Sequence, residues 1–384
     1  MNQPAIASKP HYAILDGLRG VAAVVVVIFH IFEAHATSHF DQVINHGYMA
    51  VDFFFLLSGY VIGYAYDDRW NKLSISNFFK RRLIRLHPML IMGMMVGAAC
   101  FYFQDSGLFP IVHLVSLKGL LLTMLIGFTL IPMPPAYDIR GWREMHPLDG
   151  PAWTLFFEYI ANILYGLVVR KFPNWALWIL VALSAAALVQ MTTTNLSGDV
   201  IGGWSIDLPQ LRIGFTRVMY PFFAGLLLFR ISKPAKINNA FLWCSLLVLI
   251  ILCMPRIGGV EHVWANGLYE SFVIIILFPL IVWMGASGTV NGKFAKGICK
   301  FLGDISYPIY ITHYPLIYIY TGWVFDRKIP ISQSYPQAIA VFLGAITIAY
   351  ASLKWYDIPL RKWLTRVTTN SSKIIDLKKD QYNK

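Results

Sequence analysis

Residues 14–33 read ILDGLRGVAAVVVVIFHIFE, an apolar stretch interrupted by only four ionisable side chains. A transmembrane helix needs about 20 predominantly apolar residues to cross the hydrocarbon layer of a bilayer. The stretch also resembles a signal peptide, because an A-x-A cleavage pattern follows at residues 34–36. However, Asp16 precedes the apolar run and His30 and Glu33 end it, which is not typical of a signal peptide. We therefore predict that residues 14–33 form a retained first membrane span.

The composition of the whole chain extends this prediction to many spans. Of 384 residues, 57% are hydrophobic and only 14% are charged, whereas soluble domains are about 45–50% apolar and about 25% charged. So few charges cannot cover the water-facing surface of the two soluble domains that the length alone would allow. Disorder is also excluded, because disordered chains are poor in aromatic residues and rich in charge. We predict an all-α fold, a polytopic bundle of transmembrane helices.

The net charge and the cysteines exclude further classes. The formal net charge is +12, and in a membrane protein such an excess indicates basic loops on the cytoplasmic side. We therefore expect membrane lipids around the chain and no nucleic-acid partner. The four cysteines form no C-x-x-C pair, and three lie in apolar stretches, where a free thiol behaves as a small hydrophobic group. We expect neither a disulfide framework nor a metal site.

Eleven apolar stretches are candidate membrane spans. They are residues 14–33, 48–66, 88–103, 113–131, 151–169, 174–192, 215–229, 238–255, 268–286, 301–323 and 336–353.

The basic residues between these candidates predict the topology. Six lie between residues 69 and 85, so the loop after the second candidate should be cytoplasmic. Further basic clusters lie at residues 170–171, 230–236 and 293–300 and from residue 361 onward. To place all of them on the cytoplasmic side, only one of the stretches 88–103 and 113–131 can cross, and the sequence leaves open which one. We predict about ten spans with both termini cytoplasmic.

This topology divides the chain into three parts. Residues 1–13 form a cytoplasmic N-terminus, residues 14–363 form one membrane domain, and residues 364–384 form a cytoplasmic basic tail. Localisation to a membrane as a multi-pass protein follows directly.

Arg19 and His30 are the ionisable pair of the first span. They are eleven residues apart, so about 100° per residue brings them within roughly 20° of the same helix face, about 16 Å apart along the axis. In the predicted topology Arg19 lies near the cytoplasmic surface and His30 toward the outer side. An Arg that reaches the membrane surface and a polar residue at a helix end would explain each one separately. Their shared face favours a functional site, because ionisable groups inside membranes are costly.

Two carboxylates belong to the same outer half of the bundle. Asp52 begins the second span at about the depth of His30 and could orient its imidazole ring. An exposed carboxylate at a helix start is the alternative. Glu158 follows the loop 132–150 by two turns and is the second candidate, because a Glu at membrane depth is functional by default.

Arg82 and Arg85 precede the third candidate span. Their i, i+3 spacing places both guanidinium groups on one helical face, where they could bind phosphate groups bidentately. A topology signal or a contact with anionic lipids is the alternative. Near the C-terminus, Tyr307 and His313 belong to an aromatic stripe that repeats every three residues, which indicates either packing or the lining of a pocket.

Taken together, these motifs resemble the signature of acyltransferase family 3. Six elements match in order over residues 12–363: Leu15-Asp16-Gly17-Leu18-Arg19-Gly20 with His30, Val51-Asp52 to Ser58-Gly59-Tyr60, Arg82-x-x-Arg85, Trp153-Thr154-Leu155-x-x-Glu158, Ser306-Tyr307 to His313, and Asp357-Ile358-Pro359-Leu360-Arg361. Thr154 and Asp357 replace the Ser and Glu that are usual in that family.

The resemblance implies a bacterial inner-membrane O-acyltransferase. Its donor would be acetyl-CoA or another cytoplasmic acyl-CoA, and its acceptor an extracytoplasmic carbohydrate or lipid-linked glycan. Arg19, Arg82 and Arg85 would bind the acyl-CoA. His30 would be the catalytic base or a transient acyl carrier, assisted by Asp52 or Glu158. The pocket residues would be Trp153, Tyr307 and His313.

Two other classes remain open at this point. A transporter or flippase would use the intramembrane Arg and His to bind ion and substrate, although the sequence contains no inverted repeat or paired broken helices. A scaffold of a polysaccharide synthesis complex would tolerate substitution of His30.

Overall fold

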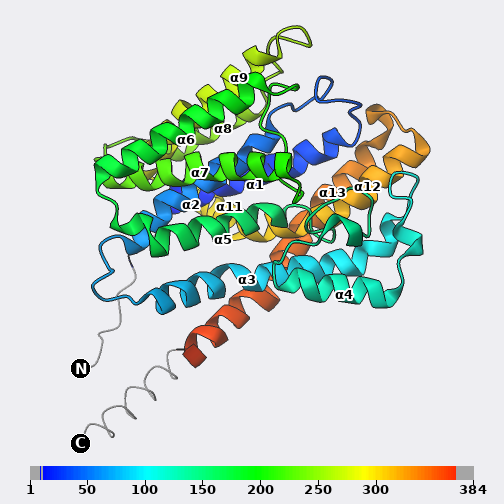
Figure 1. Cartoon of the computed structure of the whole chain (residues 1–384), viewed down its shortest axis with the longest axis horizontal. Coiled ribbons are helices and arrows are strands. Elements are labelled where there is room, and N and C mark those ends of the chain that lie inside the picture. The colour runs from blue at the N-terminus through cyan, green and yellow to red at the C-terminus, as the bar shows by residue number, and fades with distance from the viewer. Residues whose placement is uncertain (1–8, 10–11, 369–384) are drawn as a thin grey trace, which may run out of the picture.

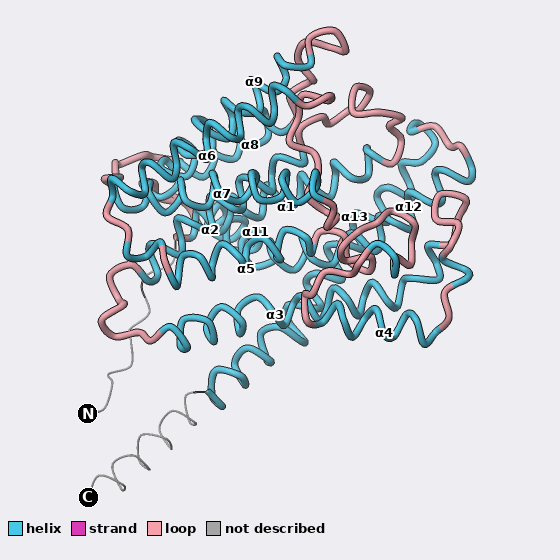
Figure 2. The backbone as a smooth tube through the Cα atoms, in the orientation of Figure 1, coloured by secondary structure: helices cyan, strands magenta, loops and turns pink. Residues whose placement is uncertain are grey.

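The computed structural model describes residue 9 and residues 12–368, and this part of the chain is helical (Figures 1 and 2). It contains no β-strand apart from a single isolated bridge. The main helices are α1 (Ala13–Glu33), α2 (Ala50–Tyr66), α3 (Ile75–Cys100), α4 (Leu117–Phe128), α5 (Ala152–Leu167), α6 (Asn174–Thr194), α7 (Leu208–Ile231), α8 (Ala240–Leu252), α9 (Val263–Phe272), α10 (Phe278–Ser287), α11 (Lys293–Thr312), α12 (Tyr314–Arg327) and α13 (Ile331–Ala351). Short π-helical segments join α9 to α10 and extend α13, so that both continue as longer helices.

Helix α1 lies at the centre of the bundle (Figure 1) and packs most closely against α11. Gly20 makes this approach possible, because a β-carbon at that position would overlap the backbone carbonyl of Leu302. Small residues allow such close contact between helices where no hydrophobic effect drives association within lipid. The N-terminal half of α1, which carries Arg19, is therefore held tightly against the helix that carries Tyr307 and Tyr310.

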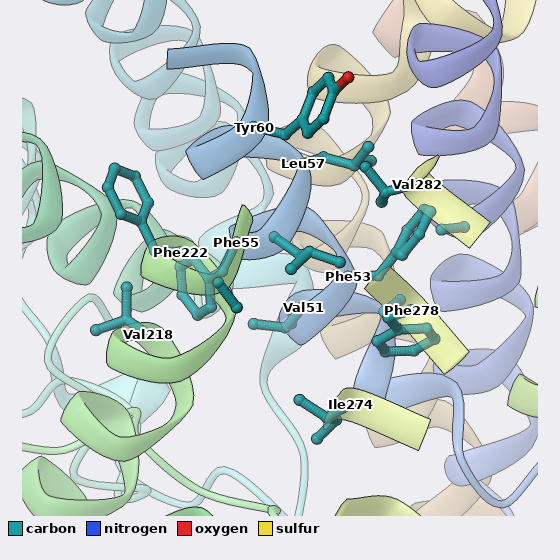
Figure 3. Close-up of a cluster of buried hydrophobic side chains, with 14 of the residues drawn as sticks. Val51, Phe53, Phe55, Leu57, Tyr60, Val218, Phe222, Ile274, Phe278 and Val282 are labelled. Carbon is teal, nitrogen blue, oxygen red and sulfur yellow. The ribbon is translucent and has the colours of Figure 1, made fainter. Parts of the chain in front are cut away.

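Helices α2 and α7 form a second close pair through reciprocal glycines. A β-carbon at Gly59 would overlap the carbonyl oxygen of Phe222, and one at Gly225 would overlap that of Leu56. Figure 3 shows α2 between two neighbours: Phe55 points toward the side chains of α7, whereas Phe53 points toward Phe278 of α10. Opposite faces of α2 are thus fixed by different helices, which sets the direction of each side chain along it.

The loops gather at two opposite ends of the bundle. At one end Arg230 donates to Asp67 at 2.6 Å and to the carbonyl of Phe172 at 2.8 Å, which joins the basic loops after α2, α5 and α7. At the other end Asp199 accepts from His39 at 3.1 Å and from Arg256 at 3.2 Å, which joins the loops after α1, α6 and α8. The loops with the basic clusters at residues 69–85, 170–171 and 230–236 therefore lie together, as the sequence predicts, and the side of the membrane that they face stays a prediction.

Hydrogen bonding at this second end perturbs both groups of the loop ion pair. The hydrogen bond to Asp199 outweighs partial burial and raises the pKa of His39. Burial opposes the charge of Asp199, yet the hydrogen bond and the positive charges of His39 and Arg256 lower its pKa. Each group thus favours the charged form of the other, and the contact fastens two loops together.

Seven helices in the described part of the chain are long and apolar enough to cross a bilayer. Helix α3 is one of them, whereas α4 has 12 residues, or ~18 Å at 1.5 Å per residue against a hydrocarbon core of about 30 Å. Of the two stretches that the sequence left open, 88–103 is thus the one that belongs to a helix of spanning length. The figure of ten spans, and the side on which the termini lie, stay predictions.

The predicted span 301–323 is not one helix. Helix α11 begins earlier, at Lys293, and ends at Thr312, and α12 starts after His313. Pro315 lacks the backbone N–H that would continue the ladder of α11, so the helix breaks there. The predicted span is therefore interrupted, and the break places His313 at a junction between two helices.

The predicted tail lies largely outside the described residues. Residues 364–368 continue the helix that follows α13, and the rest of 364–384 is not described. Most of the predicted N-terminal segment 1–13 also lies outside the described part.

Candidate active site

One large cavity, of about 590 Å³, opens into the bundle between α1, α2, α3, α5, α11 and the C-terminal helix. Arg19, Arg82 and Arg85, which the sequence predicts to act together, all line it, although they come from α1 and α3. Glu158 and Tyr307 line it as well. The volume is typical of a ligand pocket.

Lys300 and Arg361 add two more cations to the cavity wall. Four of the five basic side chains are paired with a carboxylate. The pairs are Arg19 with Asp16 at 3.0 Å, Arg82 with Glu158 at 2.8 Å, Lys300 with Asp304 at 2.6 Å and Arg361 with Asp357 at 2.9 Å.

Arg85 is the exception. Among the described residues we find no hydrogen bond or ion pair to its guanidinium group, which is half-buried in the cavity wall. The positive charges of Arg19 and Arg82 lie close enough to repel it, and the Asp16 carboxylate offsets part of that repulsion. A half-buried guanidinium without a hydrogen-bond partner loses part of its hydration without compensation. An anion in the cavity would relieve both the missing hydrogen bonds and the repulsion.

Glu158 is held by two donors that come from other helices. Arg82 donates to its carboxylate at 2.8 Å, and the Ser58 hydroxyl donates to the same oxygen at 2.6 Å. This ties α2, α3 and α5 together at the cavity wall. The expectation that Glu158 would assist His30 directly is not met, because its carboxylate faces Arg82.

His30 lies beyond the cavity, toward the end of α1 that is opposite to Arg19. Its Nδ1 is 2.6 Å from Oε2 of Glu33, one helical turn further along. Its ring stacks on the ring of His313, with centroids 5.6 Å apart and planes inclined by 27°, and meets Tyr314 edge-on at 4.8 Å. The side chain is 17% exposed. Within the described residues no hydrogen bond to its Nε2 is found.

His313 is buried completely at the junction of α11 and α12. Its Nδ1 lies 2.9 Å from the carbonyl oxygens of both Ile309 and Tyr310. Because carbonyl oxygens only accept, Nδ1 carries the proton and Nε2 carries the lone pair. That Nε2 atom has no partner in the described structure. The helix break thus holds a second imidazole against His30 in a defined tautomer.

Asp52 does not contact His30. Its two oxygens bind Arg217 of α7 at 2.7 and 3.2 Å, and both side chains are buried. The predicted role of Asp52 at His30 is therefore corrected, since Glu33 makes that contact. Trp153 is not a cavity residue either, because its ring packs against the guanidinium of Arg217 at 5.2 Å and against Gly203.

The loop 132–150, which the topology places outside, folds back into the helices. Arg140 is buried and lies over the ring of Tyr318 at 3.5 Å, and the Tyr318 hydroxyl donates to Glu144 at 2.5 Å. Burial raises the pKa of Glu144 to about 7, and burial lowers the pKa of His146 to about 3. The loop covers the flank of α12 at Tyr318 and Tyr314.

Sequence reasoning brought the three arginines together correctly but missed four partners. Lys300 was counted only as a topology signal, Arg361 as a topology signal and part of a closing motif, and Glu33 only as a helix end. Arg217 is the clearest omission, because an arginine inside a predicted span is itself a signal of a buried partner.

The fold and the site define a multi-pass helical membrane protein with a basic cavity that leads toward an imidazole pair. A family model described as an acyltransferase domain matches residues 12–354. The match covers most of the chain, and the chain therefore belongs to acyltransferase family 3.

Curated relatives are similar over different portions of the chain. "Protein 2 in picA locus" of Rhizobium radiobacter is 31% identical over 161 residues, which cover 40% of this chain and 80% of that protein. "O-acetyltransferase OatA" of Staphylococcus aureus is 25% identical over 362 residues, which cover 91% of this chain. The match spans 57% of the length of OatA. No solved structure matches the chain.

Proposed function

We propose that this protein is a membrane O-acetyltransferase. It would move an acetyl group from acyl-CoA on the cytoplasmic side to a hydroxyl of an extracytoplasmic carbohydrate, such as exopolysaccharide or O-antigen, in the bacterial inner membrane. The observation that carries the proposal is the basic cavity, which contains Arg19, Arg82 and Arg85 and extends to Tyr310, beside the stacked His313 and His30. The name of the relative OatA, an O-acetyltransferase, supports acetyl as the group and a hydroxyl as the acceptor.

Acyl-CoA fits the chemistry of the cavity. It carries phosphate groups at one end and a slender arm that ends in a thioester at the other. Arg85 has no partner of its own and offers its guanidinium to a phosphate, which it binds bidentately and with charge assistance. Arg19 lies on α1, the helix that also carries His30, and guides the arm inward.

The chemistry at His30 follows from its hydrogen bond. Glu33 accepts from Nδ1–H, which leaves the Nε2 lone pair to take the proton of the acceptor hydroxyl. The hydroxyl oxygen bonds to the carbonyl carbon of the thioester as the carbon–sulfur bond breaks. The proton on Nε2 then passes to the leaving CoA thiolate. Alternatively, the Nε2 lone pair itself bonds to the acyl carbon as the carbon–sulfur bond breaks and CoA leaves as the thiolate. In a second step the acceptor hydroxyl oxygen bonds to that carbon as the carbon–nitrogen bond breaks, and the released Nε2 takes the hydroxyl proton.

The placement of the acceptor follows from the grouping of the loops. His30 lies toward the end opposite to the basic loops after α2, α5 and α7. Basic loops favour the cytoplasmic side, so His30 would face the outer half of the membrane, where surface glycans are found.

Substitution of Arg85 tests the donor site. Arg85→Gln should weaken acetyl-CoA binding to the purified protein in lipid nanodiscs by about 10- to 100-fold, because charge-assisted hydrogen bonds contribute about 1.5–3 kcal/mol. The measurement is isothermal titration calorimetry with acetyl-CoA, and then with CoA lacking the acyl group.

Arg81→Gln is the matched control, because Arg81 is an exposed arginine on the same helix that does not line the cavity. It should bind acetyl-CoA as the unaltered protein does. Equal affinity of the Arg85→Gln variant and the unaltered protein would contradict the donor assignment. Transport or lipid flipping without acetyl transfer to membrane glycans would instead favour a transporter.

Glu33 should act as a positioning residue for His30. Glu33→Gln keeps the shape of the side chain but removes the charge that favours the imidazolium form, so the rate of acetyl transfer should fall by about 10- to 100-fold. The KM for acetyl-CoA should not change, because Glu33 does not line the cavity. A rise in KM without a fall in kcat would assign Glu33 to donor binding instead.

A further inference from the structure

The cavity stops before it reaches His30. Phe54 of α2 and Tyr310 of α11 line its inner end, whereas neither His30 nor His313 does. Tyr310 lies between the two regions, because its ring centroid is 6.2 Å from that of His313, which in turn stacks on His30. The route from the arginines to His30 that these ring contacts mark runs past Phe54 and Tyr310.

These two rings form a closed contact. Phe54 and Tyr310 meet edge-to-face, with centroids 5.2 Å apart and planes at 81°. Such aromatic pairs stabilise by about 0.5–1.5 kcal/mol beyond the area they bury. The contact closes the inner end of the cavity without blocking it permanently, because no covalent link or ion pair holds the rings together.

Tyr310 is the fixed member of the pair. The hydroxyl of Thr154 donates to the carbonyl of Pro151 at 2.9 Å, so its oxygen accepts from the hydroxyl of Tyr310 at 3.1 Å. The ring is 8% exposed. Phe54 is only partly buried and has no polar group to anchor it. The opening past the pair is therefore set by how far Phe54 turns aside.

We propose that Phe54 and Tyr310 determine the length of the acyl chain that the enzyme transfers, and restrict it to acetyl and similarly short groups. This inference rests on the proposed acyl-CoA reaction. A two-carbon group passes with the smallest displacement of Phe54. Each added methylene must displace the ring further in a region closed by Val51, Thr154 and Ile311. Hydrophobic pockets distinguish one methylene by about 10- to 200-fold.

The test compares donors of different length. Initial rates with acetyl-, propionyl- and butyryl-CoA are measured for the unaltered protein, for Phe54→Leu and for Phe54→Ala, all in nanodiscs with the same glycan acceptor. The ratio of butyryl to acetyl transfer should rise at least about tenfold in Phe54→Ala, and less in Phe54→Leu. Thr154→Val, which removes the acceptor of the Tyr310 hydroxyl, should raise the same ratio independently.

Phe53→Leu is the matched control. Phe53 is the preceding residue of α2, but it packs against Phe278 and does not line the cavity (Figure 3). Its ratio of butyryl to acetyl transfer should equal that of the unaltered protein. Three results would overturn the inference: an unchanged ratio in Phe54→Leu and Thr154→Val, a shift of equal size in Phe53→Leu, or efficient butyryl transfer by the unaltered protein.

The result also separates this inference from the function it rests on. Acetyl transfer by the unaltered protein tests the proposed activity. The ratio of butyryl to acetyl transfer tests the role of Phe54 and Tyr310. If acetyl transfer proceeds but all variants keep the same ratio, the role of Phe54 and Tyr310 is rejected and the proposed activity stands.

Discussion

Replacing His30 by alanine should lower acetyl transfer by at least about 10³-fold while the protein stays folded in the membrane. A positioned general base contributes about 10²–10⁴ to the rate, and a covalent acyl carrier would contribute all of it. The measurement is transfer of labelled acetyl from acetyl-CoA to membrane glycans, with the amount of folded protein determined by size-exclusion chromatography in detergent.

The structure gives the reason for so large an effect. His30 is the imidazole whose Nδ1 is bound to a carboxylate and whose Nε2 is left without a partner in the described residues. His313, in contrast, is completely buried. Its Nδ1 is hydrogen-bonded to two backbone carbonyl oxygens. His313 therefore supports the ring of His30 and is less suited to meet a hydroxyl group.

A histidine away from the site provides the control. His113 lies in an exposed loop beside Asp105 and does not line the cavity, so His113→Ala should transfer acetyl at the rate of the unaltered protein. Acetyl-CoA affinity should also persist in His30→Ala, since His30 lies beyond the cavity end. Normal transfer by His30→Ala would remove His30 from the mechanism.

The same variants distinguish direct transfer from an acyl-histidine. Incubation of the unaltered protein with labelled acetyl-CoA, without acceptor, should leave label on a peptide that contains His30 if the ring carries the acyl group. Direct transfer predicts no such label, because the thioester then reacts only with the acceptor hydroxyl, which is absent.

The arginines of the cavity were predictable from the sequence because they are scarce. Only 14% of the residues are charged, and a charged side chain within a span must face the bundle interior or a water-filled cavity, because exposure to lipid is costly. The eleven-residue spacing of Arg19 and His30 fixed their shared direction on α1, and the i, i+3 spacing did so for Arg82 and Arg85. Helical geometry alone therefore predicts which side chains share a face within one helix.

Contacts between helices were not predictable in the same way. Asp52 stands at the depth of His30, but helix packing turns its side chain toward α7, and only the crossing of α2 and α7 decides that Arg217 meets it. Likewise, the partner of Glu158 depends on how α3 and α5 cross. Periodicity along one helix contains no information about the rotation of the neighbouring helix.

We therefore expect Asp52→Asn to lower the stability of the folded protein and to have no direct effect on the acetyl-transfer step. The substitution leaves the buried guanidinium of Arg217 without its counter-charge. The guanidinium keeps its hydrogen bonds to the carbonyl oxygens of Tyr48 and Gly202, at 2.9 and 3.3 Å. Breaking a buried ion pair by removing one partner costs about 3–5 kcal/mol. We expect a marked drop in the thermal unfolding temperature in detergent and a low yield of monodisperse protein.

The double variant Asp52→Leu/Arg217→Met makes this argument specific. Replacing both charges by apolar groups removes the uncompensated guanidinium, and such replacements are often neutral or even stabilising. The double variant should therefore unfold at a higher temperature than Asp52→Asn alone. If Asp52 acted directly at His30, Asp52→Asn would instead stay as stable as the unaltered protein and lose activity. The two outcomes differ in the unfolding temperature, so a single pair of melting curves decides whether Asp52 belongs to the scaffold or to the reaction.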